Sequence, residues 1–322
     1  MLYALHVPIL PVLEGDKYMV SRKVLKRSAR RDIGSQGYIY ILPWIIGFLV
    51  FQLYPFIASF VYSFTDFSIL KPMSYVGLNN YIKMFTADRL YWKSLSATFK
   101  YVLIAVPGKL MFALFIAIIL NMKLRFINFF RTVYYLPSIL GGSVAISILW
   151  RFLFSKDGTV NVLLKALGIP PVDWLGNPNL ALGTMGLLVI WQFGSSMVLF
   201  LAGLRNIPSE LYEAAKVDGA GKVTVFFKIT LPMLTPIIFF NLVMQMINAF
   251  KEFNAPYLIT KGGPLNSTYL YGMMLYENAF AYLKMGYASA QSWILFIIIM
   301  LFTALAFKSS PYWTYYEDGG DF

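Results

Sequence analysis

The residues able to do chemistry in this sequence are few. There is no cysteine and a single histidine, His6, in 322 residues. This excludes disulfides, thiolate metal sites and any site that needs two histidines. The stretch Gly219-Ala220-Gly221-Lys222 lacks both the spacing and the hydroxyl residue of a Walker A loop, so the chain is not expected to bind ATP in that way. The sequence predicts no catalytic residue, no metal and no cofactor bound by this chain.

What remains is hydrogen bonding by polar side chains inside long apolar segments. Asn241, Gln245, Asn248 and Glu252 follow one another at steps of four, three and four residues, which puts them on one face of a helix. Polar groups are costly in a bilayer, so they mark either a solute pathway or contacts between helices, and both interpretations stay open. Amide and hydroxyl groups beside aromatic rings suit a sugar. The candidate pathway residues are Lys109, Gln192, Ser195, Ser196, Asn241, Gln245, Asn248 and Gln291.

Lys109 differs from the others because it carries a charge in the middle of an apolar segment, directly after Pro107-Gly108. One interpretation is that its side chain extends to the membrane surface or pairs with a neighbouring subunit. The other is that it faces a polar cavity and attracts an acidic sugar.

The composition indicates the environment of the segments that contain these residues. Hydrophobic residues make up 58% of the chain and charged residues 13%, whereas globular domains average about 45–50% and about 25%. The net charge of +12 lies between long uncharged runs and is not gathered on a polar face, which argues against a nucleic-acid partner. A lipid bilayer is therefore the expected environment.

Six segments are long and apolar enough to cross a bilayer, so the sequence predicts an all-α membrane protein with six transmembrane helices. An even number places both termini on one side, and seven basic residues between positions 17 and 31 make that side cytoplasmic. The length of the first span and the lack of a small-residue cleavage site argue against a cleaved leader. The predicted spans are Tyr38–Phe64, Tyr101–Met122, Thr132–Trp150, a stretch within Trp174–Leu204, Ile229–Phe250 and Met285–Phe307.

The expected organisation has three parts. Residues 1–37 form a basic cytoplasmic segment, residues 38–307 form the six-helix transmembrane domain, and residues 308–322 form a cytoplasmic tail. The transmembrane domain contains a polar cytoplasmic loop, residues 205–232, between the fourth and fifth spans.

This loop reads as a short helix, a break and a second helix. Ser209 is placed to cap the first helix and Gly219 to end it. The second helix is expected over residues 222–231, with Pro232 closing the loop. Physical reasoning alone favours a solvated connection and a docking surface equally.

The loop resembles the cytoplasmic signature loop of binding-protein-dependent ABC importer permeases. The residues that carry this resemblance are Glu213-Ala214-Ala215, Asp218-Gly219-Ala220, Phe226, Ile229, Leu231-Pro232 and Pro236. The wider chain looks like the carbohydrate-uptake branch, similar to the F-type subunit of maltose and oligosaccharide importers and, more narrowly, to importers of acidic oligosaccharides such as alginate. The further motifs are Ile41-Leu42-Pro43, Tyr54-Pro55, Tyr75–Tyr81 and Phe130–Pro137. The chain departs from the maltose subunit in having six spans and no large external insertion.

The resemblance implies the type I ABC importer permease fold, in a bacterial cytoplasmic membrane, with transport by alternating access. The first loop helix would insert into a cleft on a separate ATPase subunit, with Glu213 as the ionic contact, Ala214 and Ala215 as the close-packed face, and Asp218 and Gly219 at the turn. ATP and magnesium would belong to that ATPase.

The partners implied by the resemblance are a second, different permease subunit, two copies of the ATPase, a periplasmic or extracellular solute-binding protein, an oligosaccharide substrate and membrane lipid. A permease for glycerol-phosphate or another small polar solute is the alternative. A secondary sugar transporter is disfavoured, because no acidic residue lies inside the six predicted spans.

Overall fold

The computed structural model describes residue 38, residues 40–122 and residues 125–315. The predicted N-terminal segment 1–37 and residues 316–322 of the predicted tail lie outside the described residues. The described residues divide into two units, those up to Ser59 and those from Phe60 onward.

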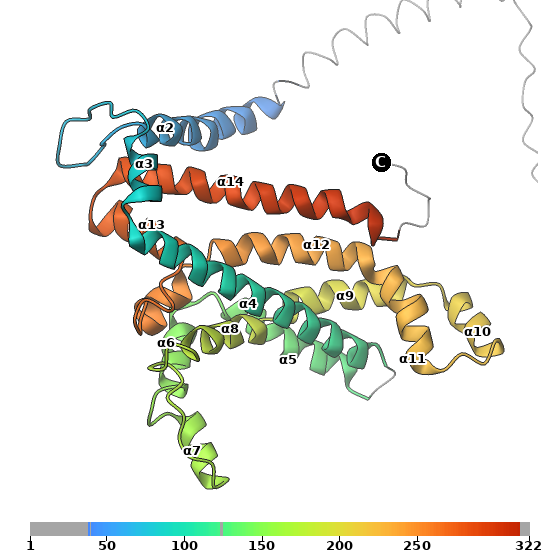
Figure 1. Ribbon diagram of the computed structural model, residues 1–322. Helices are drawn as coiled ribbons and strands as arrows, with labels where there is room; N and C mark the ends of the chain where they lie inside the picture. Colours follow the sequence, from blue (N-terminus) through green and yellow to red (C-terminus); the bar gives the residue numbers. More distant parts are fainter. Residues whose placement is uncertain (1–37, 39, 123–124, 316–322) are drawn as a thin grey trace, which may run out of the picture. The chain divides into compact units, whose positions relative to one another are not determined.

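The described residues are mostly helical (Figure 1), with two isolated β-bridges and no strand among them. In chain order the elements are η1 (Leu49–Leu53), α2 (Tyr54–Ser63), α3 (Asn79–Thr86), α4 (Arg89–Asn121), α5 (Ile127–Leu140), α6 (Val144–Leu153), α7 (Thr159–Ala166), α8 (Ala181–Trp191), α9 (Gly194–Asn206), α10 (Ser209–Val217), α11 (Lys222–Val225), η2 (Phe226–Thr230), α12 (Leu231–Phe250), η3 (Pro256–Thr260), α13 (Tyr271–Tyr276), η4 (Glu277–Ala281), α14 (Met285–Ser309) and η5 (Ser310–Tyr312).

The first unit contributes most of one apolar helix, Tyr40–Ser63, with a mean hydropathy of 1.9. It agrees with the first predicted span to within two residues. None of its described residues up to Ser59 is buried. The side chains are therefore suited to contact lipid or protein along most of the helix.

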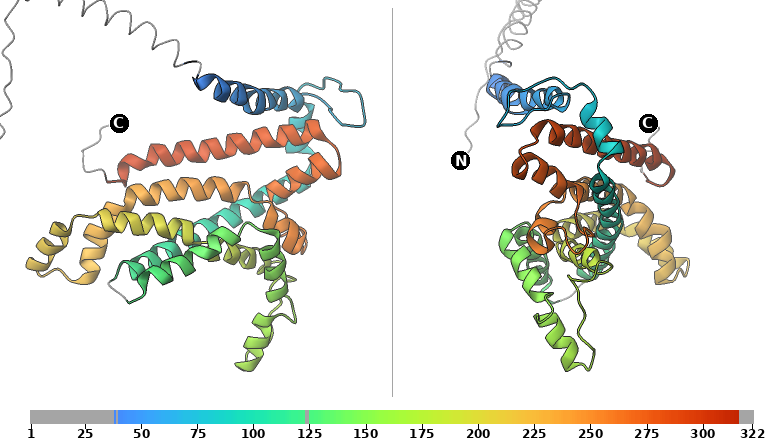
Figure 2. Two further views of the ribbon diagram at one scale, coloured as in Figure 1. Left: turned by 180° about the vertical axis from the view of Figure 1, so that it is seen from behind. Right: turned by 60° about the vertical axis from the view of Figure 1, so that its left-hand side comes forward.

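The second unit is built around α4. Asp88 begins this helix by accepting hydrogen bonds from the backbone N–H groups of Leu90 and Tyr91, at 3.0 and 3.1 Å. α4 packs against α8, α9 and α12 (Figures 1 and 2), and α14 packs on α12, α3 and α13. The central core contains large side chains that are at most 1% exposed, among them Tyr101 and Phe200. α4 is thus the helix against which the polar residues of its neighbours are positioned.

Two predicted spans are bent pairs of helices. The third predicted span, Thr132–Trp150, falls on α5 and α6, which meet at an angle of 100°. The fourth falls on α8 and α9, which meet at 48°. Counting each pair as one span gives up to six spans, in agreement with the predicted number. Glycines at 141, 142 and 194 lie at or next to the two breaks, which were not foreseen as bends.

Residues at the two bends supply hydrogen-bond partners for each other's free backbone groups. The Ser138 hydroxyl donates to the carbonyl of Gln192 (3.1 Å) and accepts from the backbone N–H of Ser195 (2.9 Å). The Gln192 side-chain amide in turn donates to the carbonyl of Gly141 (2.9 Å). Irregular backbone at membrane depth is tolerated where neighbouring groups supply such hydrogen bonds. This pairing holds the break between α8 and α9 against the end of α5.

The loop after α9 differs from the prediction in two details. The N-cap of α10 is Pro208, with no side-chain cap, so the predicted capping role of Ser209 is wrong; Ser209 is the first helical residue. Pro232 does not close the loop, because the helix runs on through Lys222–Phe250. The π-helical turn η2 ends where the backbone N–H of Leu231 bonds to the carbonyl of Phe226, and Pro232 follows in the first turn of α12. A wider turn at this point accommodates a residue without an N–H.

Candidate functional site

A polar cavity of about 210 Å³ lies between α4, the end of α8 and the end of α12. Four of the predicted pathway residues line it together: Lys109, Gln192, Gln245 and Asn248. The complete lining is Tyr101, Val106, Lys109, Val189, Gln192, Gln245, Asn248, Ala249 and Glu252. The helical period of α12 and the bend after α8 therefore bring distant polar residues to one place.

The polar groups of the cavity are suited to bind a polar solute. Lys109 is 7% exposed, and the hydroxyl of fully buried Tyr101 has no hydrogen-bond partner among the described residues. Glu252 accepts a hydrogen bond from the backbone N–H of Ala255 at 3.0 Å. Gln192 both lines the cavity and bonds to Gly141, so it fixes the bend as well as offering an amide. Amides, a hydroxyl, one cation and one carboxylate can donate hydrogen bonds to a polar solute and accept them from it.

The other four predicted pathway residues lie elsewhere. Asn241 is 1% exposed and donates to the carbonyl of Ile237 in its own helix, at 3.0 Å. Ser196 is fully buried outside the cavity, and Ser195 is exposed. Gln291 is fully buried and accepts from the Asn278 side chain at 3.3 Å, so it joins α14 to η4. Gln291 thus makes the contact between helices that was the other interpretation of intramembrane polar residues, whereas Asn241 bonds within α12.

Two of the polar lining residues, Tyr101 and Glu252, were absent from the predicted set. Glu252 had a signal, because it continues the polar face of Asn241, Gln245 and Asn248. Tyr101 had none, since a tyrosine at the start of an apolar span is ordinary for an interfacial residue. Among the described residues there is no group of three or more His, Cys, Asp or Glu side chains that could hold a metal ion.

At the opposite end of α4 from its Asp88 cap, the loop after α9 forms a second candidate site. α10 ends in a turn at Gly219, where φ is +71°. The backbone N–H of Gly219 bonds to the carbonyl of Lys216 (3.2 Å), and that of Ala220 bonds to the carbonyl of Ala215 (2.9 Å). These two bonds are the Schellman motif, in which the positive φ favours glycine. The predicted turn at Gly219 is therefore present.

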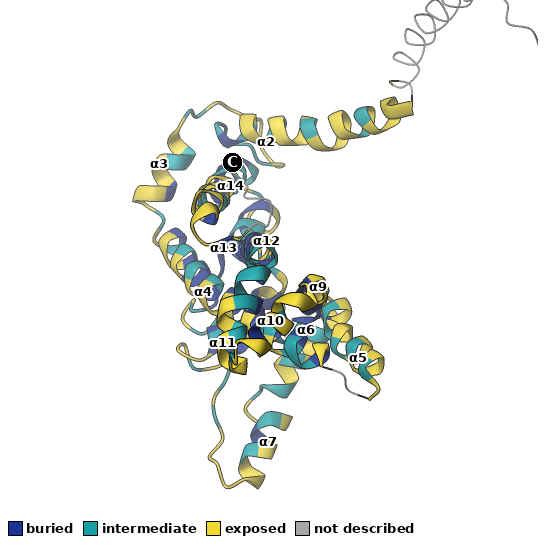
Figure 3. Cartoon of the chain, turned by 90° about the vertical axis from the view of Figure 1, so that its right-hand side faces the viewer, coloured by how far each residue is buried: buried dark blue, intermediate teal, exposed yellow. Residues whose placement is uncertain are grey.

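The residues predicted to dock on an ATPase do not all face outward. Glu213, Ala214, Asp218 and Gly219 are exposed, whereas Ala215 is 7% exposed and is buried inside the chain. Figure 3 colours the exposed parts of α10 yellow. The outward small residue of α10 is therefore Ala214, and Ala215 has a packing role.

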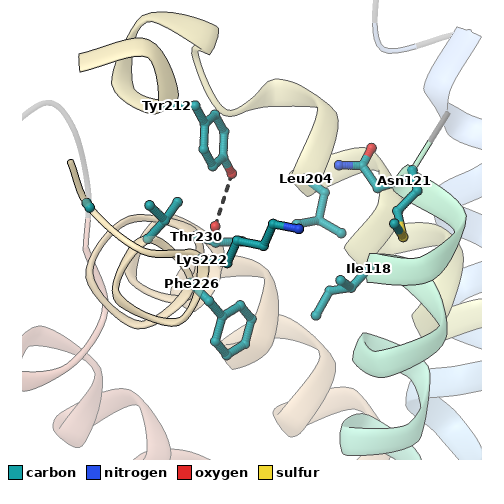
Figure 4. A pocket seen from close by; sticks show the side chains of 10 residues that line it. Ile118, Asn121, Leu204, Tyr212, Lys222, Phe226 and Thr230 are labelled. Atoms are coloured by element: carbon teal, nitrogen blue, oxygen red, sulfur yellow. Dashed lines mark hydrogen bonds between the residues drawn. The ribbon is translucent and has the colours of Figure 1, made fainter. Parts of the chain in front are cut away.

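A groove of about 360 Å³ lies beneath α10 (Figure 4), lined by residues from the loop and from the ends of α4 and α9. The hydroxyls of Tyr212 and Thr230 lie 3.1 Å apart and join α10 to η2 across it. Asn121 from α4 and Lys222 from α11 also line the groove. α10 is thus attached to η2, which continues into α12, the helix whose far end lines the cavity.

Residues 91–310 match a family described as "Binding-protein-dependent transport system inner membrane component". The chain belongs to this family. The permease component is 53% identical over 294 residues to the probable ABC transporter permease protein YesP of Bacillus subtilis, covering 90% of the chain and 95% of the relative. It is 34% identical to the arabinooligosaccharides transport system permease protein AraP of Bacillus subtilis, covering 93% and 97%.

A crystal structure of a bacterial alginate ABC transporter, in complex with a periplasmic protein that holds an alginate pentasaccharide, contains a chain of the same fold. The TM-score is 0.76 at 22% identity, over 88% of the permease component and 96% of that chain. The predicted fold of a type I ABC importer permease is confirmed. The permease component is an inner-membrane transport protein.

Proposed function

We propose that this permease component carries an oligosaccharide from an external solute-binding protein into the cytoplasm, as one subunit of an ABC importer. The observation that supports the solute class is the cavity of about 210 Å³ with its amide, hydroxyl and charged side chains. A saccharide presents many hydroxyl groups that both donate and accept, and these match Tyr101, Gln245 and Asn248. The transport of arabino-oligosaccharides by the relative AraP points to the same solute class.

The orientation follows from the basic N-terminal cluster, which we take to be cytoplasmic together with the C-terminus. The loop that contains α10 then faces the cytoplasm, and the segments containing α3, α7 and α13 face outward. In this orientation the exposed side chains of Glu213, Ala214 and Asp218 are available to a cytoplasmic ATPase. Gly219 sets the turn that presents them.

Coupling requires that the ATPase contacts differ between two states of the permease. The loop is suited to transmit such a difference, because α11, η2 and α12 form one helix from Lys222 to Phe250. Gln245 and Asn248 lie near the far end of that helix and line the cavity. A tilt of this helix would change the docking loop and the cavity together. ATP, magnesium and hydrolysis belong to the partner ATPase, of which we expect two copies, beside a second, different permease.

The test is reconstitution of the complete importer with its binding protein in proteoliposomes. A panel of neutral and acidic oligosaccharides, with glycerol-phosphate as the alternative solute, is screened for stimulation of ATP hydrolysis and for uptake. We expect one saccharide class to stimulate both, and the purified permease component alone to hydrolyse no ATP. Stimulation by glycerol-phosphate and by no saccharide would refute the solute class.

One observation favours a second candidate, a proton-coupled sugar transporter. Glu252 lines the cavity two residues after the end of α12, and an acidic group at a solute site is what proton coupling needs. Membership of the binding-protein-dependent family outweighs it. Uptake that needs ATP and persists when the proton gradient is dissipated would exclude the second candidate, whereas gradient-driven uptake without ATP would favour it.

A further inference from the structure

We propose that Lys109 binds the carboxylate of an acidic saccharide and so determines which sugars the cavity accepts. This inference rests on the proposed function, because it names the class of oligosaccharide that the importer carries.

The position of Lys109 prevents its ammonium group from reaching either membrane surface along α4. Lys109 is 20 residues from Arg89 and 12 from Asn121, which is about 30 and 18 Å at the rise of an α-helix. Its side chain is much shorter than either distance. Lys109 is also 7% exposed, whereas Leu103 and Met111 of the same helix are 72% and 66% exposed. Lys109 therefore faces the interior of the helix bundle, where it lines the cavity.

Within the described part of the chain, the charge of Lys109 has no close counter-charge. No acidic group among the described residues lies within 4.0 Å of its nitrogen, and no described residue forms a hydrogen bond with it. A buried cation without a close partner is costly, so a bound anion stabilises it. Apart from Glu252, the other polar side chains that line the cavity are neutral: Tyr101, Gln192, Gln245 and Asn248.

Glu252 is the acid that lines the same cavity, and backbone groups already share its negative charge. Its carboxylate accepts from the N–H of Ala255 at 3.0 Å. The backbone N–H groups of Phe253 and Asn254 also interact with it. The carboxylate is therefore turned to the chain that follows α12 in the manner of a helix cap. Its attraction to Lys109 acts across the cavity rather than as a contact.

The dimensions and chemistry together indicate one acidic sugar unit. A volume of about 210 Å³ equals roughly seven waters at about 30 Å³ each, which is the scale of a single sugar ring. The ring hydroxyls would bond to Tyr101, whose hydroxyl has no partner in the described chain, and to the amides of Gln245 and Asn248. The carboxylate of a uronate unit would pair with Lys109.

The test compares probes that differ in charge and share their sugar skeleton. Digalacturonate and dimannuronate are each paired with their neutral dimethyl esters. The complete importer with its binding protein is reconstituted with wild type, Lys109→Gln, Lys109→Arg or Lys100→Gln. Lys100 is exposed on the same helix, nine residues away and thus on the opposite side, so Lys100→Gln removes one positive charge outside the cavity. The readout is the ratio of acid uptake to ester uptake, in which the selectivity of the common binding protein cancels between variants.

We expect Lys109→Gln to lower this ratio by about 10- to 100-fold, the range for a hydrogen bond to a charged group. Lys109→Arg should keep most of the ratio, and Lys100→Gln should leave it unchanged. An unchanged ratio in Lys109→Gln, or an equal change in Lys100→Gln, would overturn the inference.

A measurement on the wild type covers the case in which Lys109→Gln does not assemble. In the complete complex without binding protein, a diuronate should bind at least about tenfold more tightly than its dimethyl ester. Equal binding would overturn the inference. An importer that takes up neutral sugars and no uronate would contradict the role of Lys109 and leave the proposed function standing. An importer that takes up no saccharide at all would contradict both.

Discussion

Replacing Gly219, the residue that ends α10, is expected to weaken coupling in a graded way. Its φ is +71°, and a Cβ at this position would meet no atom within 4 Å. Substitution therefore acts through backbone conformation alone, without a steric clash. The left-handed region costs an L-residue about 1–2 kcal/mol, is tolerated best by Asn, and is least accessible to β-branched residues. The expected order of impairment is Gly219→Asn, then Gly219→Ala, then Gly219→Val.

The magnitude follows from the loss of the turn. A penalty of about 1–2 kcal/mol lowers the ratio of the native turn to other conformations by about 5- to 30-fold. If only the native turn docks, the apparent affinity for the ATPase falls by no more than the same factor. The assay is saccharide-stimulated ATP hydrolysis by the reconstituted importer, titrated with the ATPase subunit.

The matched control is Gly221→Ser, two residues along the same loop. Gly221 has a φ of −71°, precedes α11 as its N-cap, and has open space around its Cβ position. Serine is a favoured N-cap residue, so this variant should behave as wild type. The reasoning would be refuted if Gly219→Val matched Gly221→Ser, or if Gly219→Asn were as impaired as Gly219→Val.

Three further substitutions test other parts of the structure. Glu213→Ala should reduce saccharide-stimulated ATP hydrolysis at least about tenfold while membrane insertion is kept. Truncating one side of an interface ion pair costs about 2–5 kcal/mol. Full stimulation would contradict the ionic contact. Gly194→Ala should lower the thermal midpoint, because its Cβ would lie 2.7 Å from the backbone oxygen of Tyr134; an unchanged midpoint would show that α5 and α9 separate easily. Asn161→Ala should speed proteolysis of residues 155–174. The amide nitrogen and oxygen of fully buried Asn161 both bond to the backbone of Val172, and each backbone group left unsatisfied costs about 1–3 kcal/mol. Wild-type resistance to proteolysis would contradict this.

The number and placement of the spans could be predicted because the length of a bilayer crossing is fixed and charges are excluded from it. The two bends could not, because their cause lies in contacts between segments far apart in the sequence. Gln192 bonds to Gly141 across 51 positions, and Ser138 bonds to the carbonyl of Gln192 across 54. Local sequence shows the glycines but not the partners that satisfy the broken backbone. Pro232 was misjudged for a similar reason, since the π-helical turn before it has no sequence signal of its own.

The candidate cavity was predictable in part. Gln245 and Asn248 were found from helical periodicity, and Lys109 and Gln192 from being polar within apolar segments; all four line the cavity. Asn241 satisfies the same periodicity but bonds to its own helix, because which turn of α12 meets the cavity depends on packing against α4. The periodicity of one helix shows which of its faces is polar. It does not show at which level along the helix axis several helices meet, and that level determines which residues form the site.

The most direct test of the central claim is the labelling of a single cysteine on the docking loop. The chain has no cysteine, and Val217, at the end of α10, is 88% exposed. Val217→Cys should react with a membrane-impermeant maleimide in inside-out vesicles and be protected when the ATPase subunit is added. Leu265→Cys, 81% exposed at the other end of the second unit, should react only in right-side-out vesicles and be indifferent to the ATPase. Labelling of Val217→Cys from outside, or labelling that the ATPase does not reduce, would contradict a cytoplasmic docking loop.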